Sequence, residues 1–380
     1  MNGPIAPEDL RFANWTRAFR GRARAAGIAG DTLDRAFADM RPLPDVIAKD
    51  RNQSEFTKTI WDYLDAAVSA ESVADGMAAL LDHGTLLDRI EAAYSVDRAV
   101  LVAIWGLESR YGAHRGDIPV IAALATLAYD GRRAAFFEGE LIAALRILQA
   151  GDVAPAQMTG SWAGAMGHTQ FIPTSYLAHA VDFDGNGTRD IWGDDPTDAL
   201  ASTAAYLVAA GWQRDQPWGV EVRLPAGFDY ALSGKKQQRA VGEWMTFGLR
   251  AVDGGALPDH GPAAVLLPAG AQGPAFLIFS NFAVISAYNA ADAYVIAVGH
   301  LSDRLRGGGP INGGWPRGDR ALTAAERMEL QQRLTDAGFN TGVVDGMLGP
   351  NSIAALRAYQ QSMGLPMDGY ANLAILERLR

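Results

Sequence analysis

The sequence of 380 residues contains no cysteine. This absence excludes disulfide bonds, zinc sites built from thiolates and a lipid-modified N-terminal cysteine in the chain as given. The chain also lacks an apolar run of 18 residues, and its first seven residues lack the hydrophobic segment of a signal peptide. We therefore expect no transmembrane segment, and we expect that a signal peptide is absent from the chain as given.

Cationic residues are outnumbered by anionic ones. The chain has 33 Lys and Arg residues against 43 Asp and Glu residues, which gives a formal net charge of −10 at pH 7. Nucleic-acid binding needs a basic surface that neutralises phosphates, so this balance argues against general nucleic-acid binding. Hydrophobic residues make up 49% of the chain and charged residues 20%, which is ordinary for a soluble globular protein of two or three domains.

Residues 8–150 show the spacing of apolar side chains that is typical of helices. We expect helices at 10–26, 31–40, 54–68, 74–93 and 97–111. From residue 213 to residue 282 the pattern changes to short β-type runs, at 220–224, 264–267 and 275–279. The sequence therefore predicts a mainly α fold in which a small β-rich insertion at 213–282 interrupts a helical domain, and helix resumes at 292–305.

A Gly- and Pro-rich stretch at 307–320 has the composition of a flexible or loosely docked linker. Three helices are expected after it, at 323–337, 352–363 and 372–379. The first begins with Thr323 and Glu326, which are spaced for a capping box, and glycines follow the first two helices. Residues 321–380 are thus predicted to form a separate, small three-helix domain.

Glu108 stands out in the segment 104–112, which reads Ile-Trp-Gly-Leu-Glu-Ser-Arg-Tyr-Gly. Helical spacing places Glu108 at the edge of a buried stripe, and Gly112 is the expected helix stop. Burial raises the pKa of a carboxyl group because the charged form loses its water, so Glu108 could carry a proton at neutral pH and act as a general acid. The alternative is a solvated or ion-paired helix residue with Arg110 as its partner.

A second motif follows about fifty residues later, where positions 160–171 read Gly-Ser-Trp-Ala-Gly-Ala-Met-Gly-His-Thr-Gln-Phe. Its small residues let the backbone approach a ligand closely. Ser161 and Gln170 supply neutral hydrogen-bonding groups, while Trp162, Met166 and Phe171 supply apolar surface. Such a surface suits a neutral, polyhydroxylated sugar.

The two motifs, in this order and at this spacing, resemble those of the lytic murein transglycosylases of the membrane-bound B type, which have a lysozyme-like catalytic core. The likeness runs from about residue 50 to residue 305, and the last 60 residues resemble the three-helix peptidoglycan-binding domain. The resemblance implies a lysozyme-like helical transglycosylase domain at 1–306, a Gly/Pro linker at 307–320 and a peptidoglycan-binding domain at 321–380.

This family's reaction would make the protein an enzyme, a carbon–oxygen lyase that cleaves the β-1,4 bond between N-acetylmuramic acid and N-acetylglucosamine in peptidoglycan. Glu108 would act alone, first as acid and then as base, and would leave 1,6-anhydromuramic acid ends. Most glycosidases use two carboxylates, but nothing in the sequence places Asp117 or Asp130 opposite Glu108. Two alternatives stay open, a muramidase-type hydrolase and a non-catalytic peptidoglycan-binding scaffold.

Substrate contacts transfer to this chain wherever the motifs match. Ser161 resembles the serine that contacts the muramyl acetamido group, Gln170 resembles the glutamine beside the acid, and Met166 lies in the same motif. Phe136 stands where relatives carry a tyrosine, so we expect stacking there without a hydroxyl contact. We expect His168 to be a surface or cleft-wall residue rather than a catalyst.

Three tyrosines, Tyr206, Tyr288 and Tyr294, occupy positions that resemble the family's cleft tyrosines. Tyr206 lies on an apolar helix, so a core role is the alternative. The partners implied by the resemblance are peptidoglycan glycan strands, and the implied location is the periplasm of a bacterial cell envelope. No cofactor is expected for catalysis.

The segment 182–192 reads Asp-Phe-Asp-Gly-Asn-Gly-Thr-Arg-Asp-Ile-Trp and matches the start of a calcium-binding loop. We expect a structural Ca²⁺ held by Asp182, Asp184, Asn186 and Thr188. The match is incomplete because Gly193 stands where a bidentate Glu is expected. The resemblance implies that a displaced Asp, corresponding to Asp198, closes the site. The competing ligands are Asp190, Asp194 and Asp195, and the alternative to a metal site is a metal-free turn.

Overall fold

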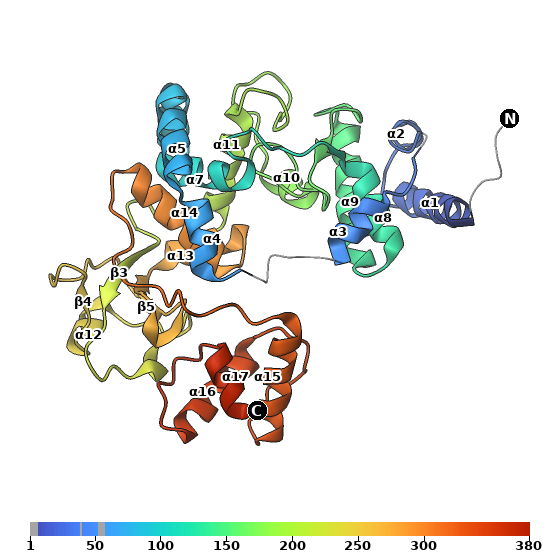
Figure 1. Cartoon of the computed structure of the whole chain (residues 1–380). Helices are drawn as coiled ribbons and strands as arrows, with labels where there is room; N and C mark the ends of the chain where they lie inside the picture. Colours follow the sequence, from blue (N-terminus) through green and yellow to red (C-terminus); the bar gives the residue numbers. More distant parts are fainter. Residues whose placement is uncertain (1–6, 39, 52–57) are drawn as a thin grey trace. The chain divides into compact units, whose positions relative to one another are not determined.

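The computed structural model describes residues 7–38, 40–51 and 58–380 (Figure 1). It divides into two compact units, one made of residues up to 53 together with 74–209, the other of 54–73 together with 210–380. Helices dominate the described residues, which confirms the predicted mainly α class. The expected helices at 31–40 and 54–68 fall partly outside the described residues.

The first unit is helical around a pair of packed helices, α8 and α9. Its helices are α1 (Pro7–Ala25), α2 (Gly30–Ala36), α3 (Pro44–Arg51), most of α5 (Ala70–Asp82), α6 (Gly84–Tyr94), α7 (Arg98–Ser109), α8 (Val120–Asp130), α9 (Ala134–Ala150), α10 (Pro173–His179) and α11 (Thr197–Ala209). Two short strands, β1 (Ile118–Pro119) and β2 (Thr159–Gly160), pair antiparallel. The alanine- and leucine-rich sequence of α8 buries eight residues, and Gly131, at φ 92°, caps its end.

Helix α7 runs through the core of this unit. Its residues from Ala99 to Trp105 are all buried, so the helix is fixed by packing on every face. At its start, the Asp97 side chain accepts a hydrogen bond from the Ala99 amide at 2.7 Å. This N-cap satisfies one of the amides that the first turn leaves without a partner.

The second unit combines a small sheet with helices. It contains α4 (Ile60–Ala67), β3 (Gly219–Arg223), α12 (Val241–Thr246), β4 (Arg250–Ala251), β5 (Ala264–Leu266), β6 (Ala275–Ile278), α13 (Ser280–Tyr288), α14 (Asp292–Leu305), α15 (Ala324–Asp336), α16 (Pro350–Ser362) and α17 (Leu373–Leu379). The sheet order is β4-β3-β6-β5, and all neighbours are antiparallel. Strands β3, β5 and β6 confirm the three predicted β-type runs to within one residue.

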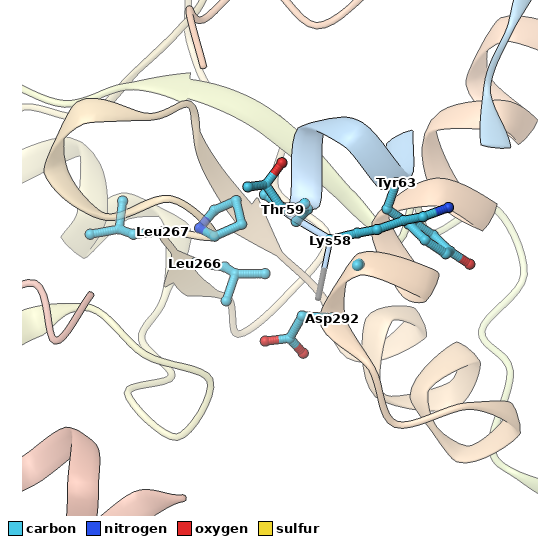
Figure 2. A pocket seen from close by; sticks show the side chains of 9 residues that line it. Lys58, Thr59, Tyr63, Leu266, Leu267 and Asp292 are labelled. Atoms are coloured by element: carbon cyan, nitrogen blue, oxygen red, sulfur yellow. The ribbon is translucent and has the colours of Figure 1, made fainter. Parts of the chain in front are cut away.

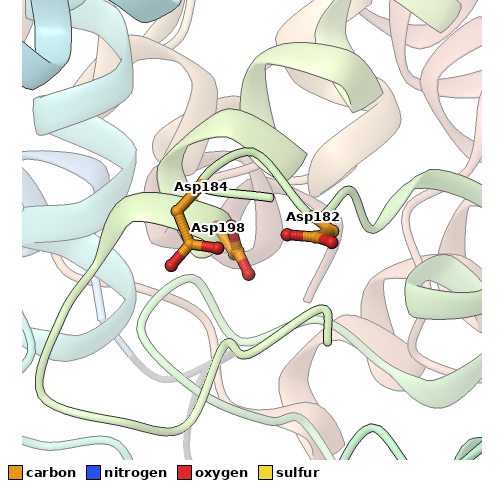
Figure 3. Close-up of side chains that lie close together, drawn as sticks. All are labelled: Asp182, Asp184 and Asp198. Atoms are coloured by element: carbon orange, nitrogen blue, oxygen red, sulfur yellow. The ribbon is translucent and has the colours of Figure 1, made fainter. Parts of the chain in front are cut away.

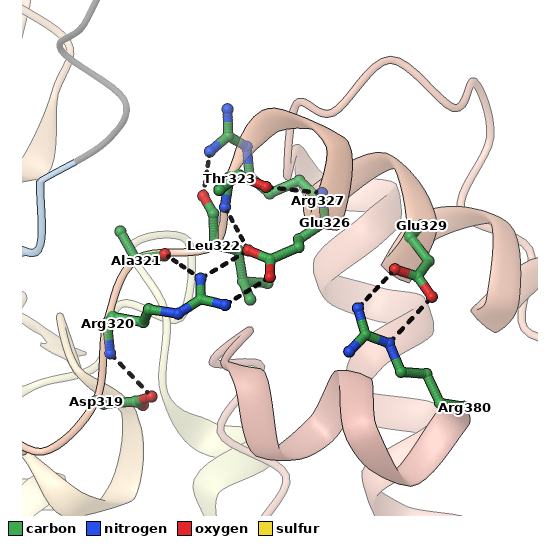
Figure 4. Close-up of polar contacts among 9 residues, drawn as sticks. All are labelled: Asp319, Arg320, Ala321, Leu322, Thr323, Glu326, Arg327, Glu329 and Arg380. Carbon is green, nitrogen blue, oxygen red and sulfur yellow. Dashed lines mark hydrogen bonds and ion pairs between the residues drawn. The ribbon is translucent and has the colours of Figure 1, made fainter.

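Polar contacts hold the start of α15 and join α15 to the end of the chain (Figure 4). Thr323 and Glu326 form the predicted capping box at the start of α15. Arg320 contacts both Glu326 oxygens, at 2.7 and 2.6 Å, and lowers the pKa of Glu326 to about 2. Arg380, at the chain end, contacts Glu329 on α15 at 2.9 Å. These contacts tie the end of the chain to the first of the three helices.

Residues 307–320 make specific contacts within the second unit. The Glu221 carboxylate on β3 accepts hydrogen bonds from the amides of Asn312, at 2.8 Å, and Gly313, at 2.6 Å. Arg317 forms an ion pair with Asp65 on α4 at 2.7 Å. The stretch is therefore held at several points along its length, which its Gly- and Pro-rich composition does not indicate.

The helix expected at 74–93 is two helices, α5 and α6, separated at His83. Gly84 begins α6, and glycine's low helix propensity favours a break that apolar periodicity alone does not reveal. In the described part of the chain, no single helix is long and apolar enough to cross a membrane. Helices α13 and α14, bent by 113° with respect to one another, meet those criteria only as a pair.

Candidate active site

Glu108 lies in the last turn of α7, one residue before the helix ends. Its side chain is half-buried, whereas Ile104, one turn earlier, is fully buried. The carboxyl group is thus at the boundary between core and solvent. A carboxyl group there loses part of its hydration and can still reach a ligand.

The backbone after Glu108 turns sharply through three consecutive left-handed residues, Arg110 at φ 49°, Tyr111 at φ 57° and Gly112 at φ 87°. The helix therefore ends at Arg110 as C-cap rather than at the expected Gly112. Left-handed non-glycine residues cost about 1–3 kcal/mol each and persist only where the surroundings hold them. A Cβ atom at Gly106 would lie 2.6 Å from the Tyr111 ring, so only glycine lets this ring fold back onto α7.

His168 is buried, at 3% exposure, which corrects the expectation of a surface or cleft-wall residue. Trp105 Nε1 donates to His168 Nδ1 at 3.1 Å, and His168 Nε2 donates to the Gly193 carbonyl at 2.7 Å. Ser109 Oγ donates to the His168 carbonyl. Burial lowers the pKa of His168, which favours the neutral ring. Through these hydrogen bonds His168 connects α7 to its own loop and to the segment around Gly193.

Arg115 extends this network. Its guanidinium contacts the Gly193 carbonyl and, at 2.9 Å, the Asp194 carboxylate, while its own carbonyl accepts a hydrogen bond from Gln170 Nε2 at 3.0 Å. Sequence reasoning missed Arg115, Trp105 and Ser109. A signal was present in the first motif, because Trp105 and Ser109 are four residues apart and share one face of α7.

The glycine-rich motif forms a compact loop. Ser161 Oγ accepts hydrogen bonds from the amides of Ala163, at 3.3 Å, and Ala165, at 3.1 Å. Added Cβ atoms at Gly160 and Gly167 would collide with the carbonyls of Ala165 and Ile191. At these two positions the small residues let the protein backbone approach itself, whereas the sequence suggested close approach to a ligand.

Two residues of this loop have defined surroundings. Met166 is fully buried, and its backbone forms isolated β-bridges with Gly160 and Phe171, so it packs inside the loop. Gln170 has a left-handed backbone, at φ 55°, and its Nε2 also donates to the Gly167 carbonyl at 2.9 Å. These bonds hold the Gln170 side chain in one orientation.

The predicted aromatic contacts have different exposures. Phe136 is 40% exposed, with the Arg133 guanidinium 4.2 Å from its ring centroid. Tyr206 is half-buried, 4.6 Å from the His179 ring, and burial raises the pKa of Tyr206. The other two predicted tyrosines belong to the second unit, where Tyr288 is half-buried at the end of α13 and Tyr294 is buried in α14. The first unit therefore contains Glu108 together with five of the predicted substrate residues, namely Phe136, Ser161, Met166, Gln170 and Tyr206.

The acidic loop brings three carboxylates together. Oxygens of Asp182, Asp184 and Asp198 all lie within 4.8 Å of one another (Figure 3). Asp198 is buried, which raises its pKa, although it accepts hydrogen bonds from the amides of Phe183, at 2.8 Å, and Asp190, at 2.9 Å. A bound cation would offset the cost of burying this charge.

The other loop residues are held by local contacts. Asn186 Oδ1 accepts from the Thr188 hydroxyl at 2.7 Å. Asp190 accepts from the amides of Trp192 and Gly193, at 2.8 and 3.0 Å, and Asp195 accepts from the Thr197 hydroxyl at 2.6 Å. Asp194 pairs with Arg115. Asp198 makes comparable contacts, so what favours it over the three competing aspartates is its place in the carboxylate cluster with Asp182 and Asp184.

The chain matches two family models, the transglycosylase SLT domain over residues 11–303 and a peptidoglycan binding domain over residues 323–379. Because the first match covers most of the chain, the protein belongs to the transglycosylase SLT-domain family. It is a lytic transglycosylase with a C-terminal peptidoglycan-binding domain, which confirms the class predicted from the two motifs.

Named relatives agree with this assignment. The crystal structure of SltB3 from Pseudomonas aeruginosa in complex with NAG-anhNAM-pentapeptide is 52% identical, with a TM-score of 0.95, over 97% of this chain and 99% of that one. The Escherichia coli lytic transglycosylase Slt35 in complex with calcium is 29% identical, with a TM-score of 0.66, over 80% of this chain and 95% of that one. The membrane-bound lytic murein transglycosylase B of Escherichia coli (strain K12) is 32% identical over 63% of this chain, and the match spans 65% of that protein's length.

Proposed function

We propose that this lytic transglycosylase cleaves the β-1,4 bond between N-acetylmuramic acid and N-acetylglucosamine in peptidoglycan, with Glu108 as the only acid and base. The observation that carries the proposal is the position of Glu108, which is half-buried at the end of α7. On the buried side of this helix, Trp105 and Ser109 are hydrogen-bonded to His168, which holds the helix end in place. A rigid support of this kind is what a single residue needs to transfer a proton twice.

Two other carboxylates of the first unit have partners of their own, in keeping with a one-acid mechanism. Glu140 is buried and accepts hydrogen bonds from the Thr174 amide and hydroxyl, at 3.0 and 2.7 Å. Asp130 is paired with Arg51 at 2.6 Å. A two-carboxylate glycosidase needs a second acid that faces the bond, and these two side chains are held by other partners.

The proposed reaction has two steps. Glu108 first donates its proton to the bridging oxygen, so that the N-acetylglucosamine side leaves with a hydroxyl group while the acetamido oxygen of the muramyl residue traps the cation. The Glu108 carboxylate then takes the proton of the C6 hydroxyl, and the C6 oxygen attacks the anomeric carbon and displaces the acetamido oxygen. The result is a 1,6-anhydro ring, and Glu108 is protonated again.

The remaining sugar contacts are part of the proposal. Ser161 and Gln170 offer polar groups in a loop that is held by its own hydrogen bonds. The exposed ring of Phe136 offers a stacking surface. Tyr206 in the first unit and Tyr288 and Tyr294 in the second are each proposed as sugar contacts, with Met166 as apolar support inside the loop.

The test of the proposal is Glu108→Gln, with Asp117→Asn as a matched control because Asp117 is an exposed acid close by in the sequence. Glutamine has nearly the same shape but cannot transfer a proton, so the turnover of purified glycan strands should fall by about 10²–10⁴, while Asp117→Asn should keep wild-type turnover. Near-normal turnover by Glu108→Gln would remove Glu108 from the mechanism.

We further infer that the acidic loop holds a structural Ca²⁺, with oxygen ligands from Asp182, Asp184, Asn186 and Thr188 and with Asp198 closing the site. The convergence of three carboxylates and the complex of Slt35 with calcium support this assignment. Hard cations such as Ca²⁺ prefer several oxygen ligands of this type. The ion would stabilise the loop and would take no part in the reaction.

We propose that the protein works in the periplasm, where its peptidoglycan substrate would lie, and that the partners of both domains are peptidoglycan strands with their peptide stems. The pentapeptide ligand of the SltB3 complex supports a substrate that carries peptides. Fractionation of cells that produce the natural full-length protein tests the location. Recovery of the protein in the cytosol would contradict it.

A further inference from the structure

The second unit contains a cavity of about 330 Å³ beside the end of β5 (Figure 2). On one side of it lie Lys58, just before α4, and Tyr63, on α4. On the other side lie Leu266, Leu267 and Asp292. The cavity therefore combines an apolar surface with a cation and an anion.

A second cavity, of about 450 Å³, adjoins the first, because Leu266, Leu267 and Asp292 line both. Lys235 and Lys236 also line this second cavity, together with residues of α16 and the loop after it. We call the two cavities together the lysine groove. It is defined by Lys58, Lys235, Lys236, Leu266, Leu267 and Asp292.

Lysine is rare in this chain, which has only four: Lys49, Lys58, Lys235 and Lys236. Three of these four line the groove, and all three are exposed. In a chain whose net charge is −10, this is a local concentration of ammonium groups in a concave surface. An ammonium group is a compact charge on a flexible stem, suited to meeting a carboxylate.

The acids of the groove offset only part of this charge. Asp292 pairs with Lys235 at 2.7 Å. Asp368 accepts hydrogen bonds from the Ala271 amide, the Gln360 side chain and its own loop, so it serves the fold. With Arg357 counted, the groove has four cations against two anions, and an anionic ligand gains from the difference.

The shape of the groove is fixed by contacts between residues near the sheet, Ser233 and Gly270, and residues of the last three helices and their loops. Arg357 Nη2 donates to the Ser233 carbonyl at 3.1 Å and to its hydroxyl at 3.0 Å. At Gly270, with φ 65°, an added Cβ would lie 2.6 Å from both Asp368 Oδ2 and Tyr370 Cβ. This close fit preforms the groove, which lowers the entropic cost of binding.

We propose that the lysine groove binds the peptide stem of peptidoglycan, with the lysine ammonium groups on the stem carboxylates and its small apolar side chains on Leu266 and Leu267. This inference rests on the proposed function and deepens it. The lysine groove would thus bind peptidoglycan strands that carry stems in preference to bare glycan, whose neutral sugars have no carboxylate for the lysines.

The first experiment compares the wild-type full-length chain with the triple variant Lys58→Gln, Lys235→Gln, Lys236→Gln, and uses Lys49→Gln, the remaining lysine, as the matched control. The substrates are strands with intact stems and strands whose stems an amidase has removed. On stem-bearing strands the triple variant should show a KM raised roughly tenfold at low salt with unchanged kcat, because three exposed ion pairs are lost. The difference should shrink at about 1 M salt, where screening is strong.

Lys49→Gln should match the wild type on both substrates. An equal KM for the triple variant and the wild type on stem-bearing strands would overturn the groove's role while leaving the proposed reaction intact. An equal loss on bare strands would also overturn it, since the lysines would then serve the glycan or the fold. A failure of the proposed function is separate, because it shows as unchanged turnover in Glu108→Gln.

The second experiment measures binding without catalysis. Free stem pentapeptide, without sugar, is titrated calorimetrically into the full-length wild type, the triple variant and Lys49→Gln. Binding to the wild type and to Lys49→Gln, weakened roughly tenfold in the triple variant, is the expected result. No binding to the wild type, or equal binding to all three proteins, would contradict the proposal.

Discussion

The substitution His168→Phe tests whether the buried network positions Glu108. Phenylalanine keeps an aromatic ring but has no ring nitrogen, so Trp105 Nε1 and the Gly193 carbonyl lose their partners at 3.1 and 2.7 Å. A buried polar group without a partner costs about 1–3 kcal/mol. The Gly193 carbonyl keeps its contact with Arg115, so it loses only one hydrogen bond, worth about 1 kcal/mol, and the total loss of stability is about 2–4 kcal/mol.

The same change should loosen the end of α7, because Trp105 lies one turn before Glu108. Displacing a catalytic group by about 1 Å can cost about 10²-fold in rate, so kcat should fall by about 10- to 100-fold with little change in KM. The assays are thermal unfolding and turnover of purified glycan strands. His114→Phe is the control, since His114 is exposed. Wild-type stability and kcat in His168→Phe would refute the positioning role.

Three further predictions concern the metal, pH and the C-terminal domain. Calcium at about a hundredfold excess over its Kd should stabilise the protein by about 2.7 kcal/mol, and Asp182→Ala should abolish the response; identical melting curves with calcium and with chelator would leave a plain turn. Burial, and then the Arg304 cation, lower the pKa of His300 to about 4 in the folded protein. Its pKa in the unfolded chain is about 6.5, so the contribution of His300 to stability is fully present above pH 6.5 and is lost as pH falls toward 4, by at most about 3 kcal/mol. His300→Gln should flatten this part of the profile of stability against pH. Deleting residues 321–380 should weaken retention on insoluble wall and also lower the melting temperature, because the Asp368 and Arg357 contacts with the sheet region are lost; an unchanged melting temperature would contradict this docking.

Much of the fold was predictable because its signals are local. The capping box of Thr323 and Glu326, the strands at β3, β5 and β6, and the helix at 292–305 depend on residues within one or two turns of each other. The break at His83 was missed, since the apolar spacing continues through it. The contacts of Glu221 with Asn312 and Gly313 join residues about ninety positions apart, and composition carries no information on such pairs.

The features of the candidate site likewise fall into those that local sequence patterns predicted and those that depend on distant segments. The position of Glu108 near the end of a helix followed from the spacing of apolar residues, and the grouping of Asp182 with Asp184 followed from the loop pattern. The burial of His168 could not be predicted from its neighbours, because it depends on Trp105 and Gly193, which approach from other segments. Its small, glycine-rich surroundings suggested an open surface, but the glycines serve close packing of the protein on itself.

The most direct test of the account is digestion of peptidoglycan by the full-length protein in water enriched in ¹⁸O, followed by mass spectrometry of the fragments. If Glu108 closes the ring with the C6 hydroxyl of the substrate, the new muramyl ends will be 1,6-anhydro sugars without ¹⁸O. Reducing muramyl ends that carry ¹⁸O would show that water attacks the anomeric carbon, and would contradict the proposed one-residue lyase mechanism in favour of a muramidase.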